Sequence, residues 1–285
     1  ELNRVRLHSA FAEGSYVGNK FLASFIRDIQ NVSTLKELPS LYKSGQANWD
    51  NNRYELSFLF HNTKDVLSFF APGAYIADST ALSMKITADG QMKANVKSGR
   101  IALKDKYLKG IKLSADNASG KLGGVMTVGE LSAGPIKTMA NKLSFNADAD
   151  SLSVDFSYDN KTELENRGVI HLGGNIFRDE NDTLRAKFRF FPSHILLNGA
   201  KWDISSSDIS FGGSDINIGN LSIHGDNQSI VLSGGYSPTM ADTLRLKMDK
   251  FDISMLNAFS KMDLKIKGLL SGNAVLISPT KERTG

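Results

Sequence analysis

"SGGYSPTMADTLRLKMDKFDISMLN", residues 233–257, shares its pattern with "LGGNIFRDENDTLRAKFRFFPSHILLN", residues 172–198. Both stretches start around a Gly-Gly pair, continue through Asp-Thr-Leu-Arg into alternating apolar and charged residues, and end in Leu-Asn. The offset between Asp182 and Asp242 is 242 − 182 = 60 residues. Because successive side chains of a β-strand point to opposite faces, this alternation predicts a strand with one apolar face. The chain therefore repeats the same half-apolar strand.

The same alternation runs through most of the chain. Further examples are residues 54–60, 82–88, 152–158 and 184–190. Strands with one apolar and one polar face are typical of antiparallel sheets. The sequences that we expect to form turns between strands include TADGQ (87–91), KSGR (97–100) and HGDNQ (224–228). The pattern predicts an all-β fold of about fifteen to eighteen strands, either an elongated antiparallel β-groove or a sandwich-like curled sheet.

Helical periodicity is confined to short segments. Residues 15–32 carry apolar residues at helical spacing, with Ser15 as the expected N-cap. A helix of about two turns is expected at residues 63–72, where Pro72 would end it, and a single turn at residues 256–261. No Pro/Ser-rich linker divides the chain. We therefore expect a strand plus a small helical element in residues 1–50, and one continuous antiparallel β-groove with an internal repeat of about 60 residues in 51–285.

Composition and motifs argue against catalysis. The absence of cysteine excludes disulfides, thiolate chemistry and Cys-ligated metals. The five histidines show no metal-ligand spacing, and NASGKLGG (117–124) fits a hairpin better than a phosphate loop. Trp202 is expected to fill a core. We predict no enzyme activity, cofactor or metal, although a hydrolase whose two carboxylates meet only in space stays an open alternative.

Charge and hydropathy bear on partners and on the ends of the chain. The net charge of +4 comes from interleaved Lys, Arg, Asp and Glu rather than a basic stripe, so we expect no nucleic-acid partner. No apolar run reaches the length of a membrane helix. The chain begins at Glu1 and ends in ISPTKERTG, and we interpret it as an interior piece of a longer protein.

Residues 202–257 carry a series of short motifs in a fixed order. They run Trp-Asp-Ile, an Ile-x-Ile strand, NLSI, Q-x-I-x-L-x-G, D-x-L-x-L and F-D-I-S-x-L-N. This order resembles the central repeat region of the TamB (translocation and assembly module) family, within the AsmA-like, bridge-like lipid-transfer group. The first 50 residues match no part of that pattern.

The resemblance implies a fold, a location and partners. Members of the family are similar to long β-grooves, called β-tacos, that cross the periplasm of double-membrane bacteria from an inner-membrane anchor. The resemblance implies a non-enzymatic periplasmic segment of such an inner-membrane-anchored protein. Its apolar groove would hold phospholipid acyl chains, for lipid transport between the inner and outer membranes, for outer-membrane protein assembly with a β-barrel partner, or for both.

The residue pattern alone leads to a similar expectation. Half-apolar strands must bury their apolar face, and the chain has too little helix to cover it. The sheet must close on itself or curl into a trough that shares its apolar face with a ligand, and repeated strands allow a trough to lengthen. The residues that we expect to line it are Leu82, Met84, Ile86, Leu152, Val154, Phe156, Leu184, Phe188, Ile230, Leu232, Leu244 and Leu246.

Two other interpretations stay open. One is a closed β-sandwich that serves as an adhesion or carbohydrate-binding module, with facing sheets filled by side chains alone. The other, a transmembrane barrel, is disfavoured because most alternating runs here span only about six to nine residues. In a repeat, Leu184 and Leu244 should face inward, with Arg185 and Arg245 facing water.

Overall fold

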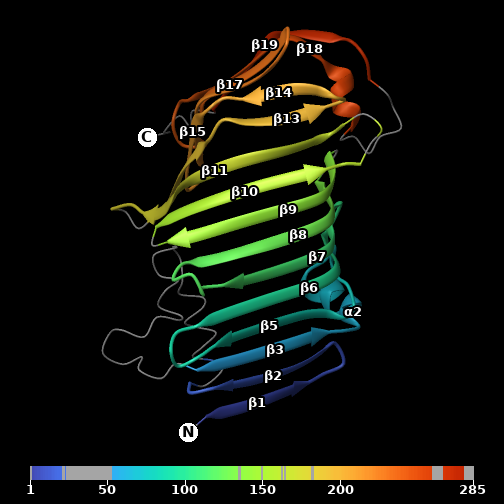
Figure 1. The fold of residues 1–285 in the computed structure, drawn as a ribbon, viewed down its shortest axis with the longest axis vertical. Coiled ribbons are helices and arrows are strands. Elements are labelled where there is room, and N and C mark those ends of the chain that lie inside the picture. Colours follow the sequence, from blue (N-terminus) through green and yellow to red (C-terminus); the bar gives the residue numbers. More distant parts are fainter. Residues whose placement is uncertain are drawn as a thin grey trace, which may run out of the picture. The chain divides into compact units, whose positions relative to one another are not determined.

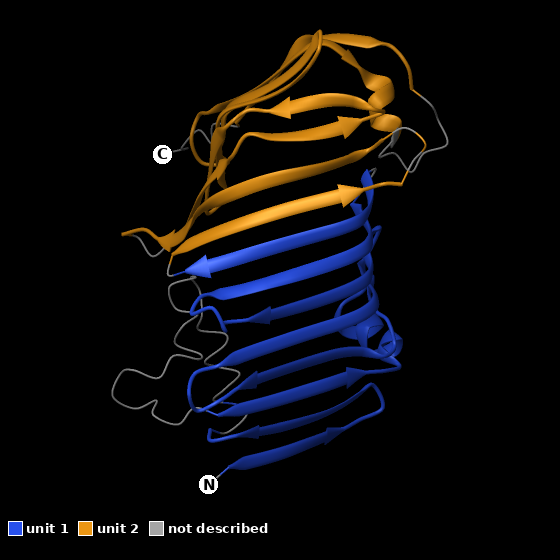
Figure 2. Cartoon of the chain, viewed as in Figure 1, with its two compact units in different colours: residues 1–149 blue, residues 150–285 orange. Residues whose placement is uncertain are grey.

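The computed structural model describes residues 2–20, 23, 53–133, 136–148, 150–161, 163, 165–180, 183–258 and 266–278. Strands make up 70% of it, and all described strand pairs are antiparallel, which confirms the all-β fold with a small helical element. The chain divides into two compact units, residues 1–149 and residues 150–285 (Figure 2). Each unit is described by itself.

Unit 1 contains most of the helix and the longest strands. Its elements are β1 (Asn3–His8), β2 (Ala12–Gly18), β3 (Tyr54–Phe60), α2 (Thr63–Phe70), β4 (Ala74–Ile76), β5 (Thr80–Ile86), β6 (Met92–Leu103), β7 (Lys106–Asp116), β8 (Leu122–Ala133) and β9 (Ile136–Asp148). The strands lie side by side in chain order, except that β3 pairs with β5 and the short β4 pairs with the far end of β6 (Figure 1). Helix α2 confirms the helix predicted just before Pro72.

The helix predicted from Ser15 onward is wrong at its start. Ser15 lies in β2, where it pairs with Arg6 on one side and Ser57 on the other. The pairing continues to Gly18, so this segment is held by a hairpin with β1 and by the sequence-distant β3 rather than by local helix propensity. Most of the remaining residues up to 32 lie outside the described part of the chain.

A row of small residues crosses the four long strands of unit 1. These residues are aligned across β6 to β9, between ladder pairs on either side, and take no part in the ladder themselves: Gly99, Gly110, Gly129 and Ala140. Gly110 has a φ of 62° and Ala140 a φ of 45°, in the left-handed region. We call these four residues the bend row, because a local break in the ladder bends a strand.

The bend row shifts the side-chain alternation by one residue. Thr138 and Asn141 are both buried, and the Thr138 hydroxyl donates to the Asn141 side-chain oxygen at 2.7 Å. In an unbroken strand, residues three apart point to opposite faces. The Asn141 amide also donates to the carbonyl oxygens of Val128 (3.2 Å) and Thr138 (3.1 Å). The strands thus pass through the bend with the same face turned inward and with these backbone groups hydrogen-bonded.

The bend row corrects two expectations from the sequence. Residues 97–100, predicted to be a turn, lie inside β6. Gly99 allows a bend within the strand rather than a reversal of the chain between two strands. Strands β6 to β9 also run for 11 to 13 residues, longer than the alternating runs suggested, because the shifted alternation hides their continuity.

Unit 2 contains shorter strands in its middle part. Its elements are β10 (Ser151–Asp159), β11 (Arg167–Arg178), β12 (Leu184–Phe190), β13 (Ser193–Leu197), β14 (Ala200–Ile204), β15 (Ser207–Gly212), β16 (Asp215–Gly225), β17 (Gln228–Tyr236), β18 (Thr243–Asp252), the 3-10 helix η2 (Ile253–Ala258) and β19 (Leu269–Ile277). The turn predicted at residues 256–261 is present in η2 up to Ala258, and the rest of it lies outside the described residues. Asn198 and Gly199 both have positive φ, as a type I′ hairpin between β13 and β14 requires.

The sheet of unit 2 changes direction where two short strands pair with different parts of one long strand. Strand β11 pairs with β12 along residues 172–178 and with β13 along 167–169, so two short strands share one long neighbour. Strand β16 pairs in the same way with β15 and β14. These interruptions are one reason why the described residues contain nineteen strands, more than the sequence predicted.

Candidate functional site

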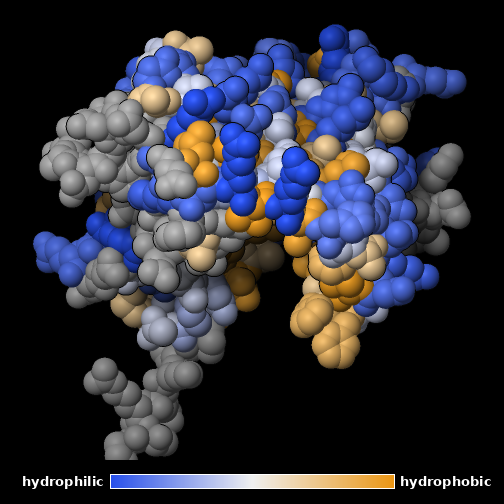
Figure 3. All heavy atoms as spheres, turned by 90° about the horizontal axis from the view of Figure 1, so that it is seen from below, coloured by the Kyte–Doolittle hydropathy of each residue, from blue (hydrophilic) through white to orange (hydrophobic). Residues whose placement is uncertain are grey.

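One face of the sheet of unit 1 carries a row of mostly apolar residues that crosses neighbouring strands. Following the register through β1, β2, β3 and β5 to β9 gives one directly opposed residue in each of these eight strands: Leu7, Gly14, Phe58, Leu82, Val96, Leu113, Met126 and Leu143. We call this set the central apolar row of unit 1. Every member is at least partly exposed, although the row crosses the middle of the sheet. Figure 3, seen from the β1 end, shows hydrophobic residues gathered inside a hollow, which is consistent with a sheet that curls around its apolar face.

A packed cluster lies on this face beside the central apolar row. Tyr16, Tyr54, Leu56 and Ile86 are buried there, with the two tyrosine rings stacked 6.4 Å apart. Ile86, predicted to line a groove, is 0% exposed and packs within this cluster. The other two predicted residues of unit 1, Leu82 and Met84, share its face but stay partly exposed.

Unit 2 carries a corresponding row. Its register aligns Leu152, Gly174, Phe188, Ile209, Ile218, Gly234, Leu244 and Leu276, which we call the central apolar row of unit 2. The remaining predicted residues of this unit share that face: Val154, Phe156, Leu184, Ile230, Leu232 and Leu246. Leu184 lies at the end of β12 opposite Arg178 and is 46% exposed. Arg185 and Arg245 project from the opposite face.

Part of the apolar face of unit 2 is filled by its own side chains. Trp202 is 1% exposed and meets the ring of Phe251 edge-on, with the ring centres 5.8 Å apart. Leu197 and Met255 complete this buried cluster, and Ile230 packs against it. Trp202 is therefore a core residue, as the sequence suggested, and Ile230 contributes to the same packing.

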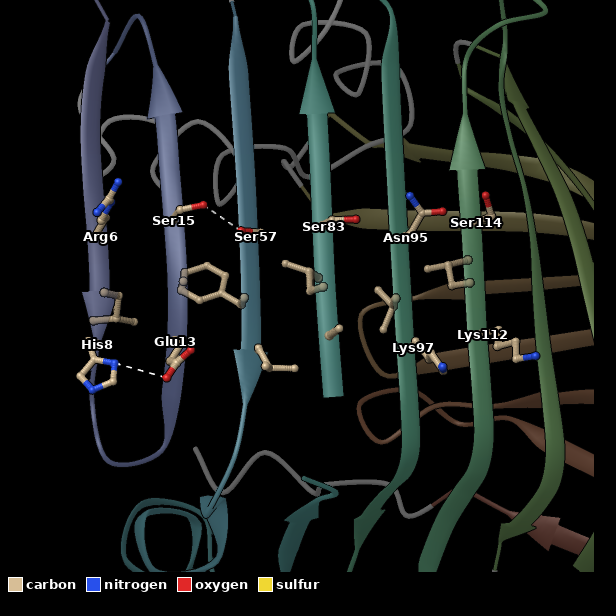
Figure 4. Close-up of a pocket in the computed structure, with 18 of the residues that line it drawn as sticks. Arg6, His8, Glu13, Ser15, Ser57, Ser83, Asn95, Lys97, Lys112 and Ser114 are labelled. Carbon is tan, nitrogen blue, oxygen red and sulfur yellow. Dashed lines mark hydrogen bonds and ion pairs between the residues drawn. The ribbon is translucent and has the colours of Figure 1, made fainter. Parts of the chain in front are cut away.

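The opposite face of unit 1 carries a shallow polar groove of about 960 Å³ (Figure 4). It runs across seven strands, β1, β2, β3 and β5 to β8, and the residues of the central apolar row form its floor through their backbone. One wall consists of Arg6, Ser15, Ser57, Ser83, Asn95, Ser114 and Val125. The other wall consists of His8, Glu13, Leu59, Ala81, Lys97, Lys112 and Thr127.

The two ends of the polar groove differ in how their polar groups are paired. At the β1 end, the His8 ring lies 3.4 Å from the Glu13 carboxylate, and the hydroxyls of Ser15 and Ser57 are 2.8 Å apart. At the β6 and β7 end, Lys97 lies directly opposite Lys112. No carboxylate among the described residues is within ion-pair distance of either ammonium group.

A second polar cluster lies beyond the bend row. The Tyr107 hydroxyl donates to the Glu130 carboxylate, and Lys137 and Lys109 lie 3.2 and 3.5 Å from it. Arg100 stacks over the Tyr107 ring at 4.7 Å. The hydrogen bond from Tyr107, followed by the contact with Lys137, lowers the pKa of Glu130 below its usual value. These contacts link strands β6 to β9 on the polar face of the sheet, beyond the bend row.

The described residues show no arrangement typical of a metal centre. No three histidine, aspartate or glutamate side chains in the described ranges lie close enough together to bind a metal ion. Within those ranges, too, no helix has the length and apolar character needed to span a bilayer.

Comparisons of the chain with protein-family models, curated proteins and solved structures gave no match. They identify no family. The order of motifs in residues 202–257 is therefore a resemblance to the TamB family and does not assign the chain to that family.

Several residues of both faces were missed by sequence reasoning. Val96, Leu113 and Leu143 alternate with polar residues, so a signal for the apolar face was present in their strands, whereas Met126 follows the apolar Val125. The meeting of Lys97 and Lys112 left no such signal, because it depends on the register between β6 and β7.

Proposed function

We propose that the apolar face holds the acyl chains of phospholipid, and that the protein is a non-enzymatic segment of a lipid conduit. The observation that carries the proposal is the central apolar row of unit 1, which stays partly exposed across eight strands. Seven strand spacings of ~4.8 Å give it a length of roughly 34 Å. A continuous apolar surface of this length favours an apolar partner over bulk water.

The absence of charge on this face supports acyl chains as the ligand. The central row and its two neighbouring rows contain no charged side chain among the described residues of β1 to β9. An unpaired charge would impose a large desolvation penalty on a hydrocarbon chain that passes it. Acyl chains need no directional hydrogen bonds, so a row of leucine, valine, methionine and phenylalanine is sufficient to bind them.

The resemblance to the TamB family supports the biological setting. We propose a periplasmic segment of an inner-membrane-anchored protein, with transport of phospholipid between the two membranes, assistance to outer-membrane protein assembly, or both. In that setting the acyl chains are the immediate partner, and an outer-membrane β-barrel is a further partner.

The proposal is tested by mass spectrometry of organic extracts from the purified protein. We expect phospholipid to co-purify with the wild type and to be largely lost in Val96→Arg, which places a charge in the central row. The matched control is Asn95→Arg, which adds the same charge one residue away on the opposite face and should retain the lipid. Thermal melts of both variants show whether they fold.

Three outcomes count against the proposal. Wild-type protein purified without detergent that contains no phospholipid would leave the apolar face without its ligand. A loss of lipid that is equal in both folded variants would show that the bound lipid does not lie on the apolar face. Unfolding of Val96→Arg alone would favour the closed, side-chain-filled sandwich, because a buried unpaired charge destabilises a packed core.

A further inference from the structure

The polar groove of unit 1 cannot share the ligand of the apolar face. Its walls project from the other side of the same strands, and the sheet itself separates the two surfaces (Figure 4). It spans seven strands, and six spacings of ~4.8 Å give it a length of roughly 29 Å. Any ligand of this groove belongs to a second site.

Lys97 and Lys112 form an uncompensated pair of cations in the groove. They are direct cross-strand neighbours, and like charges in that position repel each other. Two lysines just outside the groove on the same face are arranged differently, since Lys85 lies 3.9 Å from Glu55 and Lys93 stands opposite Asp116. Lys142 in β9, opposite Thr127, continues the row of Lys97 and Lys112 and adds a third lysine without an acidic partner among the described residues.

Three polar side chains face this pair from the other wall. Ser83, Asn95 and Ser114 are aligned across β5, β6 and β7 and make no hydrogen bond with any other described residue through their side chains. In Figure 4 they lie in one line, with Lys97 and Lys112 in the next. Two hydroxyls, one carboxamide and two ammonium groups offer the donors that a phosphate group accepts, with the charge to match.

We propose that the β5 to β7 part of the polar groove binds a phosphate ester carried on a hydroxyl-rich chain, such as a phosphorylated sugar or polyol. The phosphate lies between the two lysines and the Ser83, Asn95 and Ser114 wall. The remaining groove, with Ser57 and Ser15 along the same wall, accommodates the attached chain through its hydroxyl groups. This site is independent of acyl-chain binding on the opposite face.

Calorimetric titration at low salt tests the site with two probes, inorganic phosphate and a short poly(glycerol phosphate). The double variant Lys97→Gln/Lys112→Gln should lose about tenfold or more in affinity for both, because it removes two charge-assisted contacts. The control Lys85→Gln/Lys93→Gln removes the same charge from the same face outside the groove and should change affinity less than about twofold. Tighter binding of the polymer than of inorganic phosphate identifies the chain-borne ester as the ligand.

Four results would overturn the proposal. Equal losses in the two double variants would reveal general attraction to a basic face. If neither probe bound, the groove would hold no phosphate site. If inorganic phosphate bound as tightly as the polymer, the groove would not recognise the attached chain. Binding to phosphatidylglycerol vesicles without binding to either soluble probe would make this face a membrane-docking surface instead. None of these results depends on whether lipid occupies the apolar face.

Discussion

The two units turn their sheets in different ways. In unit 1, strands β6 to β9 continue through the bend, and the bend row of three glycines and one alanine breaks only the ladder. In unit 2, the chain stops and restarts, so that β12 and β13 share β11, while β14 and β15 share β16. Unit 1 mainly uses the conformational freedom of its bend row and interrupts its strands only where β4 and β5 share β6, whereas unit 2 uses such interruptions twice.

Both solutions rely on polar side chains to replace lost backbone hydrogen bonds. In unit 1, Asn141 donates to two carbonyl groups beside the bend row. In unit 2, the Ser193 hydroxyl accepts from the His171 N–H at 3.2 Å, and Ser205 accepts from the Ser222 N–H at 3.1 Å. A curled sheet thus needs buried hydroxyl and amide groups at its bends, because unpaired backbone groups away from water are costly.

The apolar face of each unit has a packed part and a partly exposed part. The packed parts are the clusters around Tyr54 in unit 1 and Trp202 in unit 2, and the central row of unit 1 remains partly exposed. Stability should therefore depend most on the buried clusters, and ligand binding most on the partly exposed central row. Substitutions can test this division.

The largest effect is expected for Trp202→Ala. Removing a buried tryptophan leaves a cavity and should lower the free energy of unfolding by about 3–5 kcal/mol. Leu113→Ala, in the partly exposed row of unit 1, should cost clearly less because water or ligand already reaches it. Urea denaturation of both variants measures the difference. Equal costs would show that the central row of unit 1 is packed as tightly as the Trp202 cluster.

Next in size is Asn141→Leu at the bend of unit 1. The substitution leaves buried carbonyl groups without donors and should destabilise the protein by about 1–3 kcal/mol. Asn146→Leu, an exposed position on the same strand, is the control and should have little effect on the urea midpoint. If the two variants were equally stable, the bend would not depend on the Asn141 amide.

A smaller cost is expected for Gly110→Val in the bend row. The φ of 62° at Gly110 is strained for residues with a Cβ atom, by about 1–2 kcal/mol. Gly129→Val introduces the same side chain in the neighbouring strand, where φ is not positive and a Cβ would meet ordinary contacts. Chemical denaturation should place Gly110→Val below Gly129→Val, and the reverse order would argue against a bend built on backbone conformation.

The smallest effect concerns the pH dependence of the Glu130 cluster. Because folding lowers the pKa of Glu130, this carboxylate contributes stability at pH values above its ordinary pKa of 4.5 and loses that contribution as pH falls through the lower, folded value. Thermal melts should show a weaker acid-induced loss of stability below about pH 4.5 for Glu130→Gln than for the wild type. If the two proteins lost stability identically as the pH fell, Glu130 would not contribute to the pH dependence of stability.

The sequence predicted strands and their faces where alternation was uninterrupted. Residues 152–158 and 244–248 are examples, since both lie in strands whose apolar residues share one face. It failed where the answer depends on a distant partner. Gly99 marks a bend only because it aligns with Gly110 and Gly129, and Ser15 is held in a strand by β1 and β3. Register of this kind is a property of the assembled sheet and leaves no local signal.

The most direct test of the lipid proposal compares neighbouring residues on opposite faces of one strand. A photoreactive benzophenone amino acid is placed at Leu82 on the apolar face or at Ser83 on the polar face, and the protein is irradiated with its co-purified lipid. Mass spectrometry should find a phospholipid adduct at position 82 and none at position 83, because successive residues of a strand face opposite sides. Equal labelling at both positions, or none at position 82, would contradict an acyl-chain site on the apolar face.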